Sequence, residues 1–503
     1  MTIGALFAGG LLYAPTSFAG KSNDTLVYAS DSEPESVSPY HNDVREGVTL
    51  ARLAWDTLIY RDPRTGEYRP MLATAWKWLD PLTLDVELRQ GVGFQNGDKF
   101  SADDVVFTFN YVVNPESKVV TKQNVDWIKS AEKRGDYEVR IHLKTPFPAA
   151  LEYLAGPTPI YPKAYFQKVG GVDGYSRAPI GTGPYKIVSV ALGKGVKLER
   201  NANYFKDSPR GQPSIGKLEF RVIPDHETQV AELMTGGIDW IWRVPPDQAD
   251  ALKANPKLTV VAGETMRVGY LAFDNEGRAD AKSPFKEKRV REAISYAIDR
   301  QAMVQNLVKG SSHVMDAFCF PSQFGCQPDA VRKYSYDPAK AKALLAEAGY
   351  KDGFDAEIYA YREREYAEAM IGYLRAVGIR AKLNFLKYSA LREAQRAGKV
   401  PLGFLTWASF SVNDASAMVG VFFKGGDDDF THDKQIIDWL NAADSSTDPV
   451  ERKANYAKAL GKIAEEAYAL PLFSYSSYYA FTSDLQFTPD ADEVPRFDLA
   501  HWK

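Results

Sequence analysis

The stretch that decides the fold, residues 70–111, reads PMLATAWKWLDPLTLDVELRQGVGFQNGDKFSADDVVFTFNY. Residues 83–89 alternate apolar and polar side chains, which is typical of a half-buried strand. Three glycines between residues 91 and 97 then predict a tight turn. Ser101 precedes two aspartates and an apolar run, so a hydroxyl cap and carboxylates lie where a helix exposes unpaired N–H groups. The stretch therefore predicts a strand, a turn and a capped helix.

Several residues of this stretch recur at fixed spacing in one known family. They are Ala73 and Trp76, Asp80 and Thr83, Leu88 to Val92, Phe94, Gly97, Phe100, Ala102, Asp104 and Val105. Two later segments, GTGPY at 181–185 and VREAISYAIDR at 290–300, match further patterns of that family. The chain thus resembles family 5 of the extracellular solute-binding proteins, the peptide-, opine- and nickel-binding receptors of ABC importers. The resemblance implies an α/β, two-lobe periplasmic-binding-protein (Venus-flytrap) fold with an extra subdomain on the first lobe.

Length and composition agree with this architecture. A chain of 503 residues exceeds the size at which one hydrophobic core stops growing, so two or three lobes are expected. The formal net charge of −4 rests on 61 basic and 65 acidic residues, and no long Lys/Arg cluster is present that would neutralise a run of phosphates. We therefore expect no nucleic-acid partner.

The predicted division of the chain follows the resemblance and the alternation of strand and helix patterns. After residue 273 this alternation predicts a second α/β lobe, including one long helix from Lys288 to Val308. The units are a signal peptide at 1–19, lobe I at 20–52, 184–272 and 482–503, subdomain Ib at 53–183, and lobe II at 273–481.

The amino-terminal residues predict export. Residues 1–19 are apolar and small, and Ser17 to Ala19 resembles a signal-peptidase site; the alternative is a short core helix. The first lysine is Lys21, which is compatible with a longer natural leader. No cysteine near residue 20 offers a lipid-anchor site, so we expect a periplasmic, unanchored protein. Export also predicts a disulfide between Cys319 and Cys326, with a redox or metal role as the alternative.

The search for catalytic motifs favours a receptor over an enzyme. The sequence has no His-Glu-x-x-His, Gly-x-Ser-x-Gly, P-loop or Gly-x-Gly-x-x-Gly motif, and its six histidines include no i, i+4 pair. We therefore expect no metal, no cofactor and no enzymatic activity. The predicted function is capture of a small peptide or peptide-like solute between two lobes and its delivery to an inner-membrane ABC permease by a monomer. The alternatives are an opine or nickel-chelate receptor and, from another class, a periplasmic hydrolase or peptidase.

Candidate ligand contacts come from loops at the carboxyl ends of predicted strands. In dipeptide-binding members of the family, an aspartate that pairs with the ligand's α-amino group follows a tryptophan that matches Trp407. Phe410 stands about at that position here, so we expect Asp414, the acid of this loop, to anchor a ligand ammonium, with Ser411 and Asn413 beside it. Trp407 is either a ligand-stacking wall or a core aromatic residue.

The resemblance also implies a carboxylate-binding arginine near residues 361–365. Either Arg362 or Arg364 fits, unless both belong to an exposed charge cluster at a helix start. Tyr270, Asp274 and Asn275 lie near the predicted hinge, and the prediction leaves open whether they line the hinge or the cleft. Tyr40 ends the loop that follows the first strand, at the end of the sheet that ligands favour.

Overall fold

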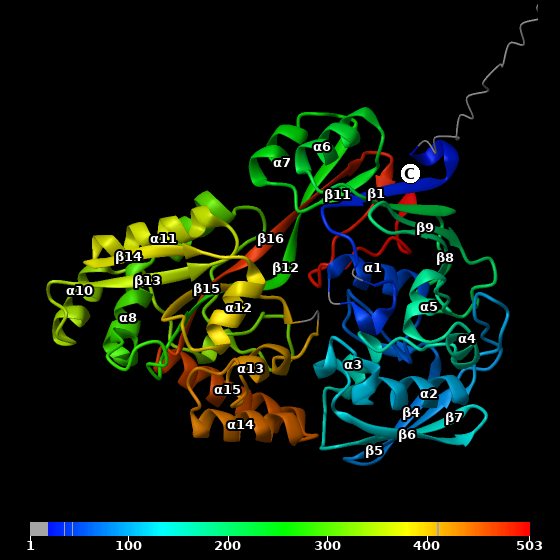
Figure 1. Cartoon of the computed structure of the whole chain (residues 1–503), viewed down its shortest axis with the longest axis horizontal. Coiled ribbons are helices and arrows are strands. Elements are labelled where there is room, and N and C mark those ends of the chain that lie inside the picture. Colours follow the sequence, from blue (N-terminus) through cyan, green and yellow to red (C-terminus); the bar gives the residue numbers. More distant parts are fainter. Residues whose placement is uncertain (1–18, 35, 43, 410–411) are drawn as a thin grey trace, which may run out of the picture.

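The computed structural model describes residues 19–34, 36–42, 44–409 and 412–503. Two lobes lie next to each other, and two long strands cross between them (Figure 1). The α/β, two-lobed fold expected from the sequence is confirmed. Residues 1–18 of the predicted signal peptide lie outside the described part of the chain. Within the described part, no helix has both the length and the apolar character that crossing a membrane requires.

A mixed sheet of ten described strands runs through both lobes. The edge strands of this sheet are β14 in lobe II and β8 in lobe I. In spatial order the strands are β14 (Ile379–Phe385), β13 (Phe354–Ala360), β15 (Leu402–Trp407), β12 (Leu258–Phe273), β16 (Ala469–Thr482), β11 (Trp240–Trp242), β1 (Thr25–Ser30), β10 (Lys217–Val222), β9 (Gly195–Arg200) and β8 (Tyr185–Ala191).

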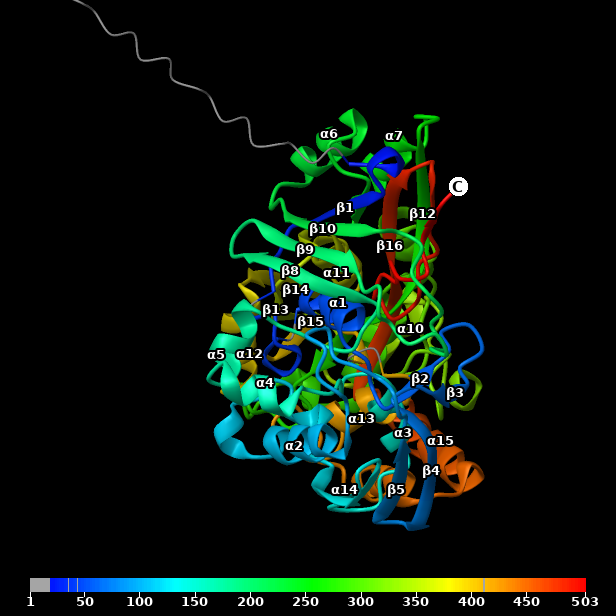
Figure 2. The same cartoon turned by 90° about the vertical axis from the view of Figure 1, so that its right-hand side faces the viewer.

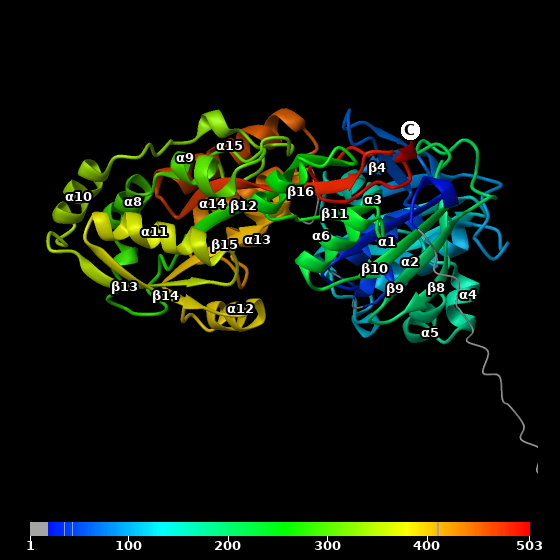
Figure 3. The same ribbon diagram turned by 90° about the horizontal axis from the view of Figure 1, so that it is seen from above.

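Strands β12 and β16 join the lobes. They pair antiparallel from Leu258 opposite Thr482 to Ala272 opposite Ala469, and the register shifts between Glu264 and Val268. Seen from above, they lie between the two halves of the molecule (Figure 3). Both strands are continuous over this length, 16 residues in β12 and 14 in β16.

Lobe I carries helix α1 (Arg45–Ala54) below its part of the sheet and α6 (His226–Thr235) and α7 (Pro246–Leu252) above it (Figure 1). Its carboxyl-terminal tail forms the short strands β17 (Leu485–Gln486) and β18 (His501–Trp502). Strand β1 is parallel to β10 and is buried along its whole length. The loop that follows β1 leads directly into α1.

Subdomain Ib is built on an antiparallel sheet at the end of the molecule away from α6 and α7 (Figure 2). Its strand order is β4 (Ala73–Asp80), β5 (Thr83–Leu88), β7 (Glu138–Leu143) and β6 (Ile128–Gly135), and β2 (Ile59–Arg61) pairs with β3 (Tyr68–Pro70) beside it. Its helices are α2 (Ala102–Val112) and α3 (Ala150–Ala155), and α4 (Lys163–Lys168) and α5 (Val172–Arg177) also fall within its predicted bounds. The predicted strand and helix of the opening stretch are thus β5 and α2.

Helix α2 begins with the predicted cap. The hydroxyl of Ser101 accepts a hydrogen bond from the backbone N–H of Asp103 at 3.3 Å, and Asp104 Oδ2 accepts one from the backbone N–H of Ser101 at 2.9 Å. This reciprocal arrangement is a capping box, which satisfies two N–H groups that would otherwise lack partners.

Lobe II differs from the sequence prediction at its first helix. Instead of one helix over 288–308, α8 ends at Ala297, Ile298 is extended, and Asp299 caps the short α9 (Arg300–Met303), which a π-helix follows. The break turns the Arg300 side chain inward, where it donates to the carbonyls of Met315, Pro471 and Tyr334. Besides α9, the helices of lobe II are α8 (Lys288–Ala297), α10 (Pro338–Glu347), α11 (Arg364–Ala376), α12 (Tyr388–Arg396), α13 (Ser416–Phe422), α14 (Lys434–Ser445) and α15 (Pro449–Glu465).

The predicted domain boundaries stay a prediction, and the packing departs from them at several places, including α4 and α5. The core of subdomain Ib consists mainly of residues between Leu58 and Ile160. Tyr161, Phe166 and Tyr175, which the prediction assigns to the subdomain, instead pack into the core of lobe I. Helices α4 and α5 therefore belong to lobe I by packing.

Cys319 and Cys326, the pair for which the sequence predicts a disulfide, are bonded to each other. Within the loop that they close, Gln323 donates to the backbone carbonyl of Val412 at 2.8 Å. The backbone N–H of Phe324 donates to the carbonyl of Asn413 at 2.9 Å. The disulfide loop therefore supports the segment that follows residue 411.

Replacing Ser101 with alanine tests the cap. We expect the Ser101→Ala change to destabilise α2 by about 1 kcal/mol, because the backbone N–H of Asp103 loses its hydroxyl acceptor while Asp104 keeps the backbone N–H of residue 101. Amide hydrogen exchange over residues 102–112 would report this as faster exchange, with Ser101→Thr as the control that keeps a hydroxyl. Unchanged exchange in the alanine variant would contradict the cap.

Candidate functional site

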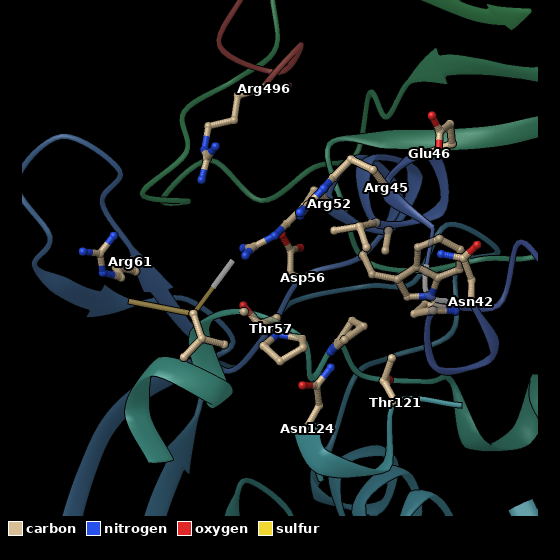
Figure 4. A pocket seen from close by; sticks show the side chains of 18 of the residues that line it. Asn42, Arg45, Glu46, Arg52, Asp56, Thr57, Arg61, Thr121, Asn124 and Arg496 are labelled. Atoms are coloured by element: carbon tan, nitrogen blue, oxygen red, sulfur yellow. The ribbon is translucent and has the colours of Figure 1, made fainter. Parts of the chain in front are cut away.

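A cavity of about 350 Å³ opens between lobe I, subdomain Ib and one loop of lobe II. Most of its wall comes from α1, the loop before it and the subdomain segments around Asn124 and Glu152 (Figure 4). Arg267 on β12 and Val412 of lobe II complete the lining. This size is typical of a site for a small molecule. The loop after β1, where a ligand was expected from the sequence, contributes directly to it.

The wall of the cavity is rich in charge. Its lining includes four carboxylates and seven arginines. The carboxylates are Glu46, Asp56, Glu152 and Asp498, and the arginines are Arg45, Arg52, Arg61, Arg210, Arg243, Arg267 and Arg496.

Two of the arginines share one carboxylate of the carboxyl-terminal tail. Glu493 lies 3.3 Å from Arg267 and 3.8 Å from Arg45. Burial acts to raise the pKa of Glu493, but Arg267 and then Arg45 outweigh it and hold this pKa below its usual value. The pairs tie α1 and the crossing strand β12 to the tail of lobe I.

A second set of buried charges, Arg210, Asp56 and Asp498, forms another part of the cavity wall. Arg210 contacts Asp498 at 2.9 Å and Asp56 at 3.3 Å, and Asp56 also accepts hydrogen bonds from Tyr204 and Thr182. Burial raises the pKa of Asp56, against the opposing effect of Arg210. Because these charges satisfy one another, they act as a rigid part of the wall.

Glu152 is the point at which subdomain Ib contacts lobe II across the cavity. Its carboxylate accepts hydrogen bonds from Tyr68 at 2.8 Å and from the backbone N–H of Asn413 at 2.9 Å, and Arg61 lies 3.2 Å away. Val412 and Ala417 of lobe II also pack against the subdomain core. The two sides of the cavity are therefore in direct contact.

The predicted ammonium anchor, Asp414, is committed to partners within lobe II. Its carboxylate accepts from Arg452 at 2.8 Å and from the Tyr456 hydroxyl at 3.1 Å, and it also accepts from the backbone N–H of Ser416. Asp414 is 4% exposed and does not line the cavity. Its role as a ligand anchor stays a prediction, and this geometry argues against it.

The two predicted carboxylate-binding arginines also lie outside the cavity lining. Arg362 is paired with Glu363, and its guanidinium stacks on Tyr475. Arg364 is exposed on α11, where it pairs with Glu368. Both arginines thus have ion-pair partners at or next to the start of α11, in line with the alternative of a charge cluster, and their role in carboxylate binding stays a prediction.

The other predicted contacts are scattered. Trp407 donates to the carbonyl of Ala417, Asn275 to that of Tyr468 and Tyr40 to that of Pro159. Tyr270 is a buried core residue of lobe II, and Asp274 accepts from the backbone of 278 and 279. Phe410 and Ser411 lie outside the described residues. Asn413 lies next to the cavity, because its backbone N–H contacts the lining residue Glu152. None of the described candidates belongs to the lining of the cavity.

The sequence did not predict any of the arginines that line the cavity as ligand contacts. Arg45 and Arg52 lie seven residues apart on α1, which places them on one helical face, so a pair of arginines on a largely buried helix was an available signal. Arg210, Arg267 and Arg496 carry no local signal, because their place in the wall depends on contacts between distant segments.

No group of three or more histidine, cysteine or acidic side chains suited to a metal ion occurs within the described ranges. The lining offers fixed charges, hydrogen-bond donors and two aromatic residues, Trp55 and Tyr60, which is the chemistry of recognition. Two lobes joined by crossing strands around a charged cavity define the class of two-lobed solute-binding proteins.

Comparison with known proteins places the chain within this class. The family described as "Bacterial extracellular solute-binding proteins, family 5 Middle" matches residues 67–430. The chain belongs to the bacterial extracellular solute-binding proteins of family 5. The family and the similar proteins are binding proteins of transport systems.

Among curated proteins, the glutathione-binding protein GsiB of Salmonella typhi is 28% identical over 487 residues, which covers 93% of this chain and 92% of GsiB. HbpA2 from Haemophilus parasuis has a solved structure with a TM-score of 0.81 at 24% identity, covering 95% of this chain and 100% of that chain. The periplasmic binding protein DppA from Helicobacter pylori, solved with the peptide STSA, has a TM-score of 0.80 at 24% identity over 96% of this chain and 98% of that chain. The two structures share the fold of this protein.

The Asp414→Asn variant distinguishes the structural role of Asp414, as the charge partner of Arg452, from its predicted role as a ligand anchor. Because the change leaves the buried Arg452 without its charge partner, we expect lobe II to lose about 3–5 kcal/mol of stability. Thermal unfolding, with hydrogen exchange over α14 and α15, would measure this, and Asp438→Asn on the surface of α14 is the matched control. A large loss of ligand affinity with unchanged unfolding would instead support the predicted anchor.

Removing the Glu152 carboxylate should favour an open arrangement of the lobes. In Glu152→Ala the backbone N–H of Asn413 loses a charged acceptor, an interaction of about 1.5–3 kcal/mol. We expect small-angle scattering to show a larger radius of gyration than for wild type, whereas Glu132→Ala on the exposed face of β6 should match wild type. Identical scattering of all three proteins would mean that Glu152 does not hold the lobes together.

Proposed function

We propose that this protein is the periplasmic solute-binding component of an ABC importer, that it captures a small peptide or peptide-like solute between its lobes, and that it delivers this solute to an inner-membrane permease. The observation that carries the proposal is the charged cavity that Glu152 and Val412 border from opposite sides. A zwitterionic solute finds both guanidinium and carboxylate groups there. The name of the relative GsiB, a glutathione-binding protein, supports a short peptide as the solute.

Binding of this kind gives the transporter a signal. A ligand that contacts both sides of the cavity stabilises the closed arrangement through its higher affinity for that state. The crossing strands leave the lobes connected while they move, and one protein molecule suffices for each solute. The protein acts in this proposal as a monomeric receptor without catalytic activity.

An opine-like amino-acid conjugate is the second candidate. It shares the carboxylates and the ammonium of a peptide, and it suits the same arginine-rich wall. The solved structure of AgaA in complex with agropinic acid has the same fold, with a TM-score of 0.78. A nickel chelate is less favoured, because the described residues contain no cluster of metal-binding side chains.

A thermal-shift screen tests the proposal. Di- and tripeptides including glutathione, opines and nickel–histidine are added to the purified protein, and a peptide present at one hundred times its dissociation constant should stabilise the folded state by about 2.7 kcal/mol. Chromatography of the incubated peptides checks for cleavage products. Stabilisation by metal chelates alone would overturn peptide binding, and peptide cleavage would favour the peptidase alternative.

A further inference from the structure

Arg52 differs from the other arginines that line the cavity. Arg45, Arg61, Arg210, Arg243, Arg267 and Arg496 each have a carboxylate oxygen within 4.0 Å. For Arg52 the structure shows no such carboxylate among the residues that it describes. The acids whose charge acts on Arg52 are Asp492 and Glu152, and they are already paired with Arg496 and Arg61.

The guanidinium of Arg52 is nonetheless held in place. Its Nη1 donates to the backbone carbonyl of Ala155 at 3.0 Å, at the end of α3, and its own backbone carbonyl accepts from Arg210 at 2.6 Å. Figure 4 shows the side chains of Arg52 and Arg496 pointing toward the same space. Arg52 is therefore oriented before a ligand arrives, and its remaining N–H donors have no hydrogen-bond acceptor among the described residues.

Electrostatics around Arg52 favour an incoming anion. Burial, together with the nearby guanidinium of Arg496, lowers the pKa of Arg52 to about 10, so the side chain stays protonated at neutral pH. A buried cation without a partner is costly, and a carboxylate matches the planar fork of a guanidinium through two parallel hydrogen bonds. The cavity thus holds a preoriented cation that has no carboxylate of the described chain within 4.0 Å, and the charges of Asp492 and Glu152 only partly offset the effects of burial and Arg496 on it.

A second polar group lies in the same cavity. Asn124 is 5% exposed, and its Oδ1 has no hydrogen-bond partner among the described residues. Figure 4 shows this side chain on the wall formed by subdomain Ib. A side-chain amide matches a ligand peptide group, since rotation presents either its acceptor or its donors.

We propose that Arg52 binds a carboxylate of the solute, so that this receptor takes a peptide or peptide-like acid whose carboxylate lies against α1 of lobe I. The assignment rests on the proposed function, and it places an anion contact in lobe I rather than in the loops of lobe II. Asn124 then faces an amide of the same solute. Neutral peptides without a free carboxylate are excluded from tight binding.

Calorimetric titration tests this with paired probes. The probes are glutathione, Ala-Glu and Ala-Ala, each compared with analogues in which one carboxylate at a time is a carboxamide. The proteins are wild type, Arg52→Gln, Arg52→Lys and, as matched control, Arg134→Gln, an exposed arginine of β6. We expect conversion of one particular carboxylate to weaken binding to wild type by about tenfold to a hundredfold, the range for a hydrogen bond to a charged group.

The variants identify the partner of that carboxylate. Arg52→Gln should weaken binding of the acid by a similar factor but change binding of its carboxamide little, Arg52→Lys should recover part of the loss, and Arg134→Gln should match wild type. Equal affinity of acid and carboxamide for wild type, or an equal loss of both in Arg52→Gln, would overturn the role of Arg52 and leave peptide binding intact. If no probe bound wild type, the proposed function and the role of Arg52 would both fail.

Discussion

The ladder between β12 and β16 is the constraint on which the rest of the molecule depends. The strands pair from one lobe into the other, and β15 and β11 continue the sheet on either side. Because every lobe movement must pass through this ladder, the lobes can twist and bend but cannot separate. Register shifts between Glu264 and Val268 and between Gly269 and Tyr270 interrupt the ladder near Arg267, which lines the cavity. A strand bends and twists locally at such irregularities.

Local signals account for the part of the fold that the sequence predicted. Strand β5 and the Ser101 cap of α2 follow from alternation and from side chains next to the backbone groups that they satisfy. The predicted helix over 288–308 failed for the opposite reason. Its apolar spacing was real, but Arg300 is bound by carbonyls at 315, 334 and 471, and these distant partners decide the break.

The site was predicted less well than the fold. The family resemblance predicted ligand contacts in loops of lobe II. In the structure, Asp414 and Arg362 of these loops are paired with residues of the same lobe. The charged wall lies mostly in lobe I and is assembled from α1, the crossing strand and the carboxyl-terminal tail. A pairing such as Arg267 with Glu493 joins residues far apart in the chain, and no periodicity in the sequence encodes it.

The ends of the long sheet have a consequence for how copies of this protein meet. An open sheet invites a further strand at each edge, which is a common route to aggregation. At one edge, β14 presents the exposed cations Arg380 and Lys382. At the other, β8 carries Lys186 and an irregularity between Ile187 and Ser189. Charged side chains at both edges and the bulge in β8 disfavour pairing with a further strand, so the sheet that joins the lobes is protected against edge-to-edge association.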